Sequence, residues 1–326
     1  MNSGNLEANR CIHPRGTTMS LLRHLLTAPT SVPDQPSIDD WWRAFTGVCG
    51  QWPAPVERAI AGGFAADRVA WAFCSGYQAA LRALLPSLPD AAIAALCATE
   101  KDGNRPKAIQ TRLSRTDAGW RLSGHKKWTT LGPASSLLLV VARLDDGDEG
   151  RPALKVVRIA GDVPGVRLQA MPATRFVPEA PHAEVYLTDV AVGDDQVLDG
   201  DGYERYLKPF RTVEDIHVQA AVLAYLVREA RHREWPRPFI EQTVSCLLTL
   251  VDLAGRDPSD SVTHIALAGA LAQSGERFVQ ADELWRTDGE GAAAAARWLR
   301  DRSLMQVAGT ARQQRSERAW ERLAES

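Results

Sequence analysis

The spacing of hydrophobic residues divides this chain into three zones. In residues 19–95 apolar side chains recur at helical intervals, for example at every fourth position in Val69, Phe73 and Tyr77. Residues three or four positions apart lie on the same face of a helix, so this spacing predicts helices with one buried face. We therefore predict an N-terminal helical domain over residues 19–95, preceded by a disordered tail at residues 1–18.

The spacing changes to a period of two between residues 96 and 200. The segments GWRLSGHKKW and HAEVYLTDVAV alternate polar and apolar residues, whereas SSLLLVVARL is a continuous apolar run. Alternation is typical of half-buried strands, and a short apolar run between turn-rich connectors is typical of a fully buried strand. Residues 96–200 are therefore predicted to form a small β-barrel or sandwich domain with mostly antiparallel neighbours.

Helical spacing returns after the β-domain and continues through the rest of the chain. Val213, Ile216 and Ala220 begin one apolar stripe, and three later segments show the same period. We predict a C-terminal helical domain, similar to a four-helix bundle, over residues 203–326. The predicted fold class is α+β, with a helical domain on either side of a central β-domain.

Composition narrows the possible functions. The chain is 45% hydrophobic and 24% charged with a formal net charge of −2, and it lacks the basic stripe of a nucleic-acid-binding protein. No apolar run reaches the roughly 18 residues that a membrane span requires. The five cysteines are scattered, without metal-ligand spacing, which indicates buried thiols in a reducing compartment and no metal site. We expect a cytoplasmic protein.

The segment GHKKWTTLG carries the clearest candidate chemistry. It places an indole, Trp128, beside two hydroxyls, Thr129 and Thr130, just before the predicted buried strand. An indole can stack on the face of a flat aromatic ligand while a hydroxyl bonds its polar edge. The alternative interpretation is structural: Trp128 packs between sheet and helices, and the threonines are present for their β-propensity.

Three segments in order resemble the acyl-CoA dehydrogenase family of flavoproteins. These are CATEKDGNRPKAIQT, GHKKWTTLG and AEVYLTDVAVGDDQVLDGDGY, flanked by helical zones as in that family. The resemblance implies FAD bound between the β-domain and the C-terminal helices. It assigns Trp128 and Thr130 to the flavin and Thr99 to the pyrimidine edge of the ring, and we include Thr129 among the candidate cofactor-binding residues.

The phosphate-binding elements of the family are altered in this chain. The serine that meets the flavin pyrophosphate is absent from KDGNRP, where Asn104 or a backbone amide is the replacement donor and Arg105 could offset phosphate charge. The late glycine-rich loop is reduced to QVAGTA, which leaves Gln306 and Gly309 as candidate cofactor contacts. A simple break between helices is the alternative interpretation of that segment.

The resemblance also implies a catalytic carboxylate. Many members carry it in a Tyr-Glu-Gly-Thr loop near the C-terminus, and we find no such loop before the chain ends at ERAWERLAES. Members that place it at the start of the first helix after the β-domain match Glu214, with Asp215 as a fallback. Alternatively, Thr212 and Asp215 form a capping box and Glu214 is only a helix-start residue. Arginines are concentrated toward the C-terminus. We interpret them either as a solvated helix face or as contacts to the phosphates of coenzyme A or FAD.

The function implied by the resemblance is α,β-dehydrogenation of an acyl thioester, carried by coenzyme A or a carrier protein. Glu214 would take the α-proton, the β-hydride would go to the flavin, and electrons would pass to an electron-transfer flavoprotein. A homodimer or homotetramer is implied. Two alternatives stay open: a flavin monooxygenase of the same fold, and a non-catalytic, flavin-poor partner subunit of a full-length dehydrogenase.

Overall fold

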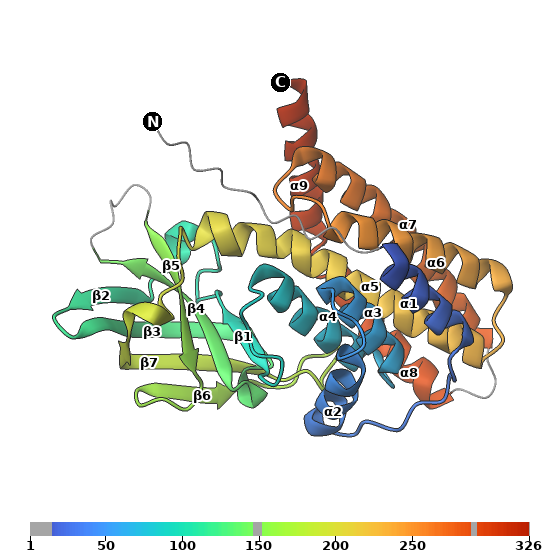
Figure 1. The fold of residues 1–326 in the computed structure, drawn as a ribbon, viewed down its shortest axis with the longest axis horizontal. Helices are drawn as coiled ribbons and strands as arrows, with labels where there is room; N and C mark the ends of the chain where they lie inside the picture. Colours follow the sequence, from blue (N-terminus) through green and yellow to red (C-terminus); the bar gives the residue numbers. More distant parts are fainter. Residues whose placement is uncertain (1–14, 146–151, 288–291, 326) are drawn as a thin grey trace.

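The computed structural model describes residues 15–145, 152–287 and 292–325. It has N-terminal helices, a curled central sheet and C-terminal helices in that order (Figure 1). The predicted α+β fold class is therefore confirmed. None of the helices within these ranges is long and apolar enough to cross a membrane.

Four helices form the N-terminal zone. The first begins at Arg15, four residues before the predicted start at Met19, so part of the expected tail is helical. The rest of that tail, residues 1–14, lies outside the described residues. Ser37 caps the second helix by accepting a hydrogen bond from the Asp40 amide. The four helices are α1 (Arg15–Thr27), α2 (Ile38–Cys49), α3 (Pro55–Ala65) and α4 (Val69–Leu84).

Seven strands form one curled sheet. Its order is β1-β4-β2-β3-β7-β6, with β5 paired to β4. The predicted antiparallel neighbours are present in four pairs, while β1 and β2 both pair with β4 in parallel. A separate hydrophobic core fills the inside of the curl. The strands are β1 (Ala94–Cys97), β2 (Arg112–Thr116), β3 (Gly119–Thr130), β4 (Leu137–Leu144), β5 (Leu154–Ala160), β6 (Val166–Ala170) and β7 (His182–Val192).

The C-terminal zone is built around its first helix, which follows a π-helical turn at Tyr203–Leu207. This helix, α5, starts near the sheet and runs along the N-terminal helices (Figure 1). The later helices pack around it or extend beyond it. They are α5 (Lys208–His232), α6 (Arg237–Ala254), α7 (Ser261–Thr287), α8 (Ala292–Asp301) and α9 (Gly309–Ala324).

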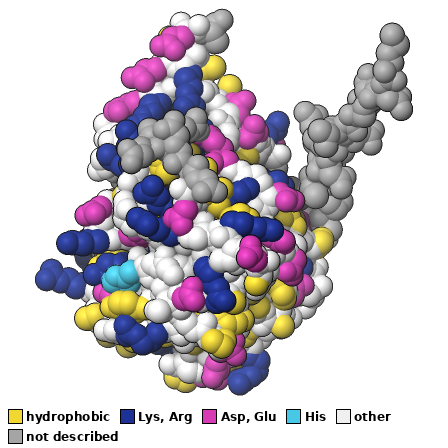
Figure 2. Space-filling model, turned by 90° about the vertical axis from the view of Figure 1, so that its left-hand side faces the viewer, with side chains coloured by type: hydrophobic (Ala, Val, Ile, Leu, Met, Phe, Trp, Pro, Cys, Tyr) yellow, Lys and Arg dark blue, Asp and Glu magenta, His cyan; other side chains and the backbone are white. Residues whose placement is uncertain are grey.

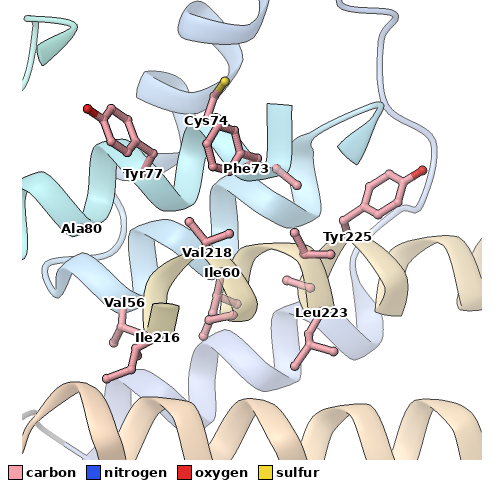
Figure 3. Packing of buried hydrophobic residues seen from close by; sticks show 14 of the residues in the cluster. Val56, Ile60, Phe73, Cys74, Tyr77, Ala80, Ile216, Val218, Leu223 and Tyr225 are labelled. Carbon is pink, nitrogen blue, oxygen red and sulfur yellow. The ribbon is translucent and has the colours of Figure 1, made fainter. Parts of the chain in front are cut away.

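Two glycines allow α3 and α4 to approach α5 closely. A Cβ at Gly63 would overlap the Ala221 carbonyl oxygen, and a Cβ at Gly76 would lie 2.6 Å from the Val218 Cα. Side chains from the three helices, including Ile60 and Val218, gather in one core (Figure 3). The N-terminal and C-terminal helices therefore form one packed body, which fixes the position of the start of α5 beside the sheet.

Candidate active site

A β-bulge in β3 determines where Trp128 points. Lys126 pairs with Val185 of β7 and Thr129 pairs with Ala183, so two residues of β3 lie opposite one residue of β7. Trp128 adopts a left-handed conformation with φ +58°. The extra residue interrupts the alternation of the strand and re-aims the side chains that follow. Trp128 consequently lies on the outer face of the sheet.

The outer face at the bulge carries an exposed indole and a polar edge. Trp128 is 53% exposed, and its ring meets the His182 ring edge-on at 6.0 Å. The Thr130 hydroxyl lies 3.4 Å from Nε2 of the same histidine. Burial lowers the pKa of His182. A hydrogen bond to the Ala180 backbone opposes this effect but does not cancel it. An accessible aromatic face beside a hydroxyl and a neutral imidazole fits a flat ring with hydrogen-bonding edges.

Thr129 does not share this face. Its side chain is fully buried inside the sheet, on the same side as Lys126. The cofactor contact of Thr129 stays a prediction, with its side chain buried on the inner face. The bulge explains this placement, because it turns Trp128 and Thr130 outward and leaves the residue between them inward.

A buried ion pair lies directly beneath the bulge. Lys126 Nζ donates to Glu100 Oε1 at 2.6 Å, and the lysine side chain is 0% exposed. Glu100 also accepts bonds from the Gln110 amide at 2.7 Å and from the Thr111 hydroxyl at 2.7 Å. The segment between β1 and β2 is thereby anchored to β3. Sequence analysis missed this pair, although a lysine at an inward position of a strand is a detectable signal.

The pair holds Thr99 next to the bulge. The Lys127 amide donates to the Thr99 carbonyl oxygen at 2.8 Å, one residue before Trp128. Burial alone would raise the pKa of Glu100, but the Lys126 charge and the hydrogen bonds from Lys126 and Thr111 lower it below its usual value. Glu100 is therefore ionised at neutral pH, and Thr99 is held beside the strand residue that precedes the exposed indole.

Asn104 connects the same segment to α5. Arg211 Nη2 donates to Asn104 Oδ1 at 2.9 Å. The carbonyl oxygen of the Asn104 side chain is thus engaged, and its amide group is the part that could donate to a ligand. Arg105 is exposed. This contact places the first turns of α5, which carry Glu214, close to the segment that holds Thr99.

Glu214 occupies a half-buried position on α5. Burial raises its pKa to about 7, the charge of Asp215 adds to the increase, and Arg312 and Arg211 oppose it. A carboxylate with this pKa is suited to accept a proton near neutral pH. The helix begins at Lys208, so Glu214 lies in its second turn and not at its start. The alternative interpretation as a capping-box neighbour is therefore wrong.

Asp215, the fallback base, is engaged elsewhere. It is 7% exposed and accepts hydrogen bonds from Arg312 Nε at 2.9 Å and Arg315 Nη2 at 2.7 Å. Both of its oxygens are therefore engaged by guanidinium groups. Both arginines belong to α9, so the interpretation of the late arginines as a solvated face is wrong for these two residues.

Gln306 and Gly309 lie at the turn before α9 and at its first residue. Both are exposed, and a Cβ at Gly309 would meet nothing within 4 Å. Arg312 Nη1 donates to the Met305 carbonyl oxygen at 2.6 Å, which ties this turn to the start of α5 through Asp215. The two candidate phosphate contacts are thus placed on the α5 side of the site, not on the sheet.

The structure also contains cavities away from these residues. One of about 440 Å³ is lined by Trp42 and Arg82, and one of about 1260 Å³ by residues that include Leu248 and His217. Neither is lined by Trp128 or Glu214. The candidate site is defined by the contacts of Lys127 with Thr99 and of Arg211 with Asn104, which link the bulge in β3 to the start of α5. Within the described ranges, no group of three or more His, Cys, Asp or Glu side chains could hold a metal ion.

The helix–sheet–helix order and the curled sheet define an acyl-CoA dehydrogenase-like fold. Butyryl-CoA dehydrogenase from Megasphaera elsdenii superposes with a TM-score of 0.70 at 15% identity, over 98% of this chain and 100% of that one. A crystal structure described as an FAD-dependent dehydrogenase gives 0.70 at 14% identity, over 99% and 100%. At these identities the superpositions show the fold alone.

Sequence comparison agrees with the fold. Residues 95–190, from β1 to β7, match the model of the acyl-CoA dehydrogenase middle domain. Benzylmalonyl-CoA dehydrogenase of Aromatoleum aromaticum (strain DSM 19018 / LMG 30748 / EbN1) is 28% identical over 200 residues, covering 57% of this chain and 51% of the relative. 3-Sulfinopropanoyl-CoA desulfinase of Paraburkholderia xenovorans (strain LB400) is 42% identical over 90 residues, covering 26% and 23%.

Residues 95–190 therefore belong to the acyl-CoA dehydrogenase middle-domain family, and the chain as a whole has an acyl-CoA dehydrogenase-like fold. It spans about half the length of the first of these relatives and about a quarter of the second.

Proposed function

We propose that this protein is an FAD-dependent oxidoreductase that dehydrogenates the Cα–Cβ bond of an acyl thioester. The observation that carries the proposal is the exposed indole of Trp128, held outward by a bulge beside the Thr130 hydroxyl. Trp128 would pack against the ring of the flavin, and Thr130 and Thr99 would bond its polar edges. When bound, FAD supplies the acceptor for the hydride that leaves Cβ.

Glu214 is the proposed catalytic base. Its pKa of about 7 leaves a useful fraction deprotonated at neutral pH, ready to accept the α-proton of the thioester. A bound substrate would exclude water from the carboxylate and strengthen this basicity further. Arg211 and Asn104 hold the neighbouring segment of the β-domain in place, which orients the start of α5 relative to Thr99.

FAD binding is the first test. The purified protein is titrated with FAD and binding is followed by flavin fluorescence, for the wild type, Trp128→Ala and Trp120→Ala. Trp120 lies on the same strand, but its indole donates to Asp194 at 2.7 Å and stays clear of the bulge. We expect Trp128→Ala to weaken binding about 5- to 150-fold, because stacking on an aromatic side chain is worth about 1–3 kcal/mol, and Trp120→Ala to bind normally. Equal affinities for the two variants would contradict the proposed flavin site.

Proton abstraction is tested separately. The FAD-loaded protein is mixed anaerobically with a panel of acyl-CoA thioesters, and bleaching of flavin absorbance is recorded. We expect bleaching in the wild type and its loss in Glu214→Gln, which should still retain FAD. The control Glu241→Gln, at an exposed position on α6, should bleach as the wild type does. Unchanged bleaching in Glu214→Gln would remove this residue from the mechanism.

The proposal extends to partners. Electrons would leave through an electron-transfer flavoprotein, and coenzyme A or a carrier protein would present the acyl group. Large apolar side chains exposed on α7 and α9, among them Val262, Val279 and Trp320, support assembly as a homodimer or homotetramer through the C-terminal helices. Sedimentation velocity measures the oligomeric state, and a monomer at micromolar concentration would contradict this part of the proposal.

One observation favours the alternative of a flavin-poor partner subunit. The Asn104 carbonyl is already bound by Arg211, and Gln306 and Gly309 are both exposed. A protein that stays colourless after FAD addition, yet binds a full-length dehydrogenase, would support that function. A monooxygenase of the same fold would show oxygen-dependent turnover and no anaerobic bleaching with acyl-CoA.

A further inference from the structure

The C-terminal helix α9 is attached to the start of α5 by two arginines that share one buried carboxylate. Arg312 donates to Asp215 Oδ1 through Nε at 2.9 Å and through Nη2 at 2.7 Å, and Arg315 Nη2 donates to Oδ2 at 2.7 Å. Such charge-assisted, multidentate contacts are stronger and more directional than single neutral hydrogen bonds. The sequence separation of about 100 residues makes this a tertiary contact and not a helix-surface pair.

This attachment lies next to the proposed base. Glu214 precedes Asp215 directly, and Arg312 acts on both carboxylates. The other charged or titratable groups that face Glu214 are Arg211 on α5 itself and Tyr77 on α4. Arg211 is bound by Asn104 from the β-domain. The charge around Glu214 is thus supplied by several elements, and α9 contributes the cation that Asp215 holds in place.

We propose that Asp215 is a positioning residue: it holds Arg312 of α9 as the cation beside Glu214, while Arg315 only secures the same carboxylate, so that the docking of α9 controls the proton on Glu214. The inference rests on the proposed role of Glu214 as base. It implies that the site is complete only when the C-terminal helix is in place, and that α9 is part of the active site without touching the substrate.

The two partners of this arrangement act on Glu214 in opposite directions. After burial, the charge of Asp215 is the next influence that raises the pKa of Glu214, whereas Arg312 lowers it. Asp215→Asn removes the neighbouring anion but keeps an Oδ1 that can accept the hydrogen bonds from Arg312, so Glu214 should lose its proton at lower pH. Arg312→Met removes the facing cation, so Glu214 should keep its proton to higher pH. If the substitutions only loosened α9, water would reach Glu214. Its pKa would then fall toward that of an ordinary carboxyl group in both variants.

The experiment follows the protonation of Glu214 in the full chain without flavin or substrate. Infrared difference spectra are recorded across pH, and the carboxyl band of Glu214 is the one that disappears in Glu214→Gln. We expect a wild-type midpoint near 7, a lower midpoint in Asp215→Asn and a higher one in Arg312→Met, each displaced by about one pH unit or more.

Arg315→Met is the matched control. Arg315 binds the same carboxylate at a similar distance but through Oδ2, whereas Arg312 binds Oδ1 and opposes the rise in the pKa of Glu214. We expect it to lower the thermal midpoint by about as much as Arg312→Met while leaving the Glu214 midpoint near its wild-type value. If Asp215→Asn fails to fold, the contrast between the two arginine variants still decides the question.

Displacement of Asp215→Asn and Arg312→Met in the same direction, or of neither, would overturn the inference. Equal displacement in Arg312→Met and Arg315→Met would also overturn it. Because the measurement needs neither cofactor nor substrate, it is independent of the proposed activity. Retained bleaching in Glu214→Gln would refute the catalytic role of Glu214, while the infrared result would still establish or refute the control of its proton by α9.

Discussion

The buried pair of Lys126 and Glu100 allows a quantitative test of how the sheet supports the bulge at Trp128. The change is Lys126→Met, which keeps the length of the side chain and removes its charge. Lys126 is 0% exposed and Glu100 is 7% exposed, with 2.6 Å between Nζ and Oε1. After the substitution Glu100 remains buried without its cation.

Breaking a buried pair by removing one partner destabilises a protein by about 3–5 kcal/mol. Glu100 keeps its bonds from the Gln110 and Thr111 amides and from the Thr111 hydroxyl. These donors offset part of the loss, so we expect a value near the lower end, about 3 kcal/mol. A typical domain unfolds with about 5–15 kcal/mol, so this is a large fraction of the total. Replacing both charges, in Lys126→Met with Glu100→Gln, should recover most of the loss because no unpaired charge remains buried.

The assay is urea unfolding of the wild type, the two single variants and the double variant, analysed as a double-mutant cycle. The pH dependence supplies a second criterion. In the wild type the pKa of Glu100 is lowered, so its contribution to stability is present above its unfolded pKa and is lost as the pH falls through the folded value. In Lys126→Met burial raises that pKa, so the variant should gain stability as the pH falls. A loss below about 1 kcal/mol, or a double variant no more stable than Lys126→Met, would refute the reasoning.

Two further predictions concern packing and surface charge. Gly63→Ala should destabilise the protein by about 1–3 kcal/mol or more, because its Cβ would overlap the Ala221 carbonyl oxygen; the helical control Gly47→Ala, with nothing within 4 Å, should stabilise it by about 0.5–1 kcal/mol. Thermal unfolding measures both, and equal effects would contradict the close helix contact. Hydrogen bonds from Tyr186 and then Lys127 lower the pKa of Glu184 to about 2. Its stabilising contribution is present above the unfolded pKa and lost as the pH falls toward 2, so Glu184→Gln should flatten acid unfolding in that window, and an unchanged profile would contradict it.

The order of helices and strands could be predicted because hydrophobic period is a local property of the sequence. The alternation in β7 and the helical spacing in α4 each depend on neighbours within a few residues. The parallel pairing of β1 with β4 could not be predicted, since it joins segments about 40 residues apart. The start of α1 at Arg15 was also missed, because that segment has no apolar stripe to mark it.

The candidate site was predictable in composition but not in geometry. Strict alternation along β3 would put Trp128 on the same side as Lys126, inside the sheet. The bulge reverses this, and bulges depend on register with β7, which a single sequence does not reveal. In the same way the partners of Asp215 lie on α9, far along the chain, where a run of arginines with interspersed glutamates is typical of a solvated helix face.

The conformation at Trp128 is difficult to explain by stability alone. A bulky residue with φ +58° is held in a sparsely populated region, at a cost of order 1–3 kcal/mol. The same residue leaves half of a large apolar ring in water. A glycine at position 128 would relieve the backbone strain, and a tryptophan that pointed inward would bury its ring. Neither the left-handed conformation nor the exposed ring of Trp128 is therefore favoured by folding. The surrounding structure nevertheless over-determines the bulge: Lys126 is fixed from below by Glu100, and Lys127 is bonded to Thr99. Local strain maintained by dedicated contacts, beside the Thr130 hydroxyl, is what a ligand site requires.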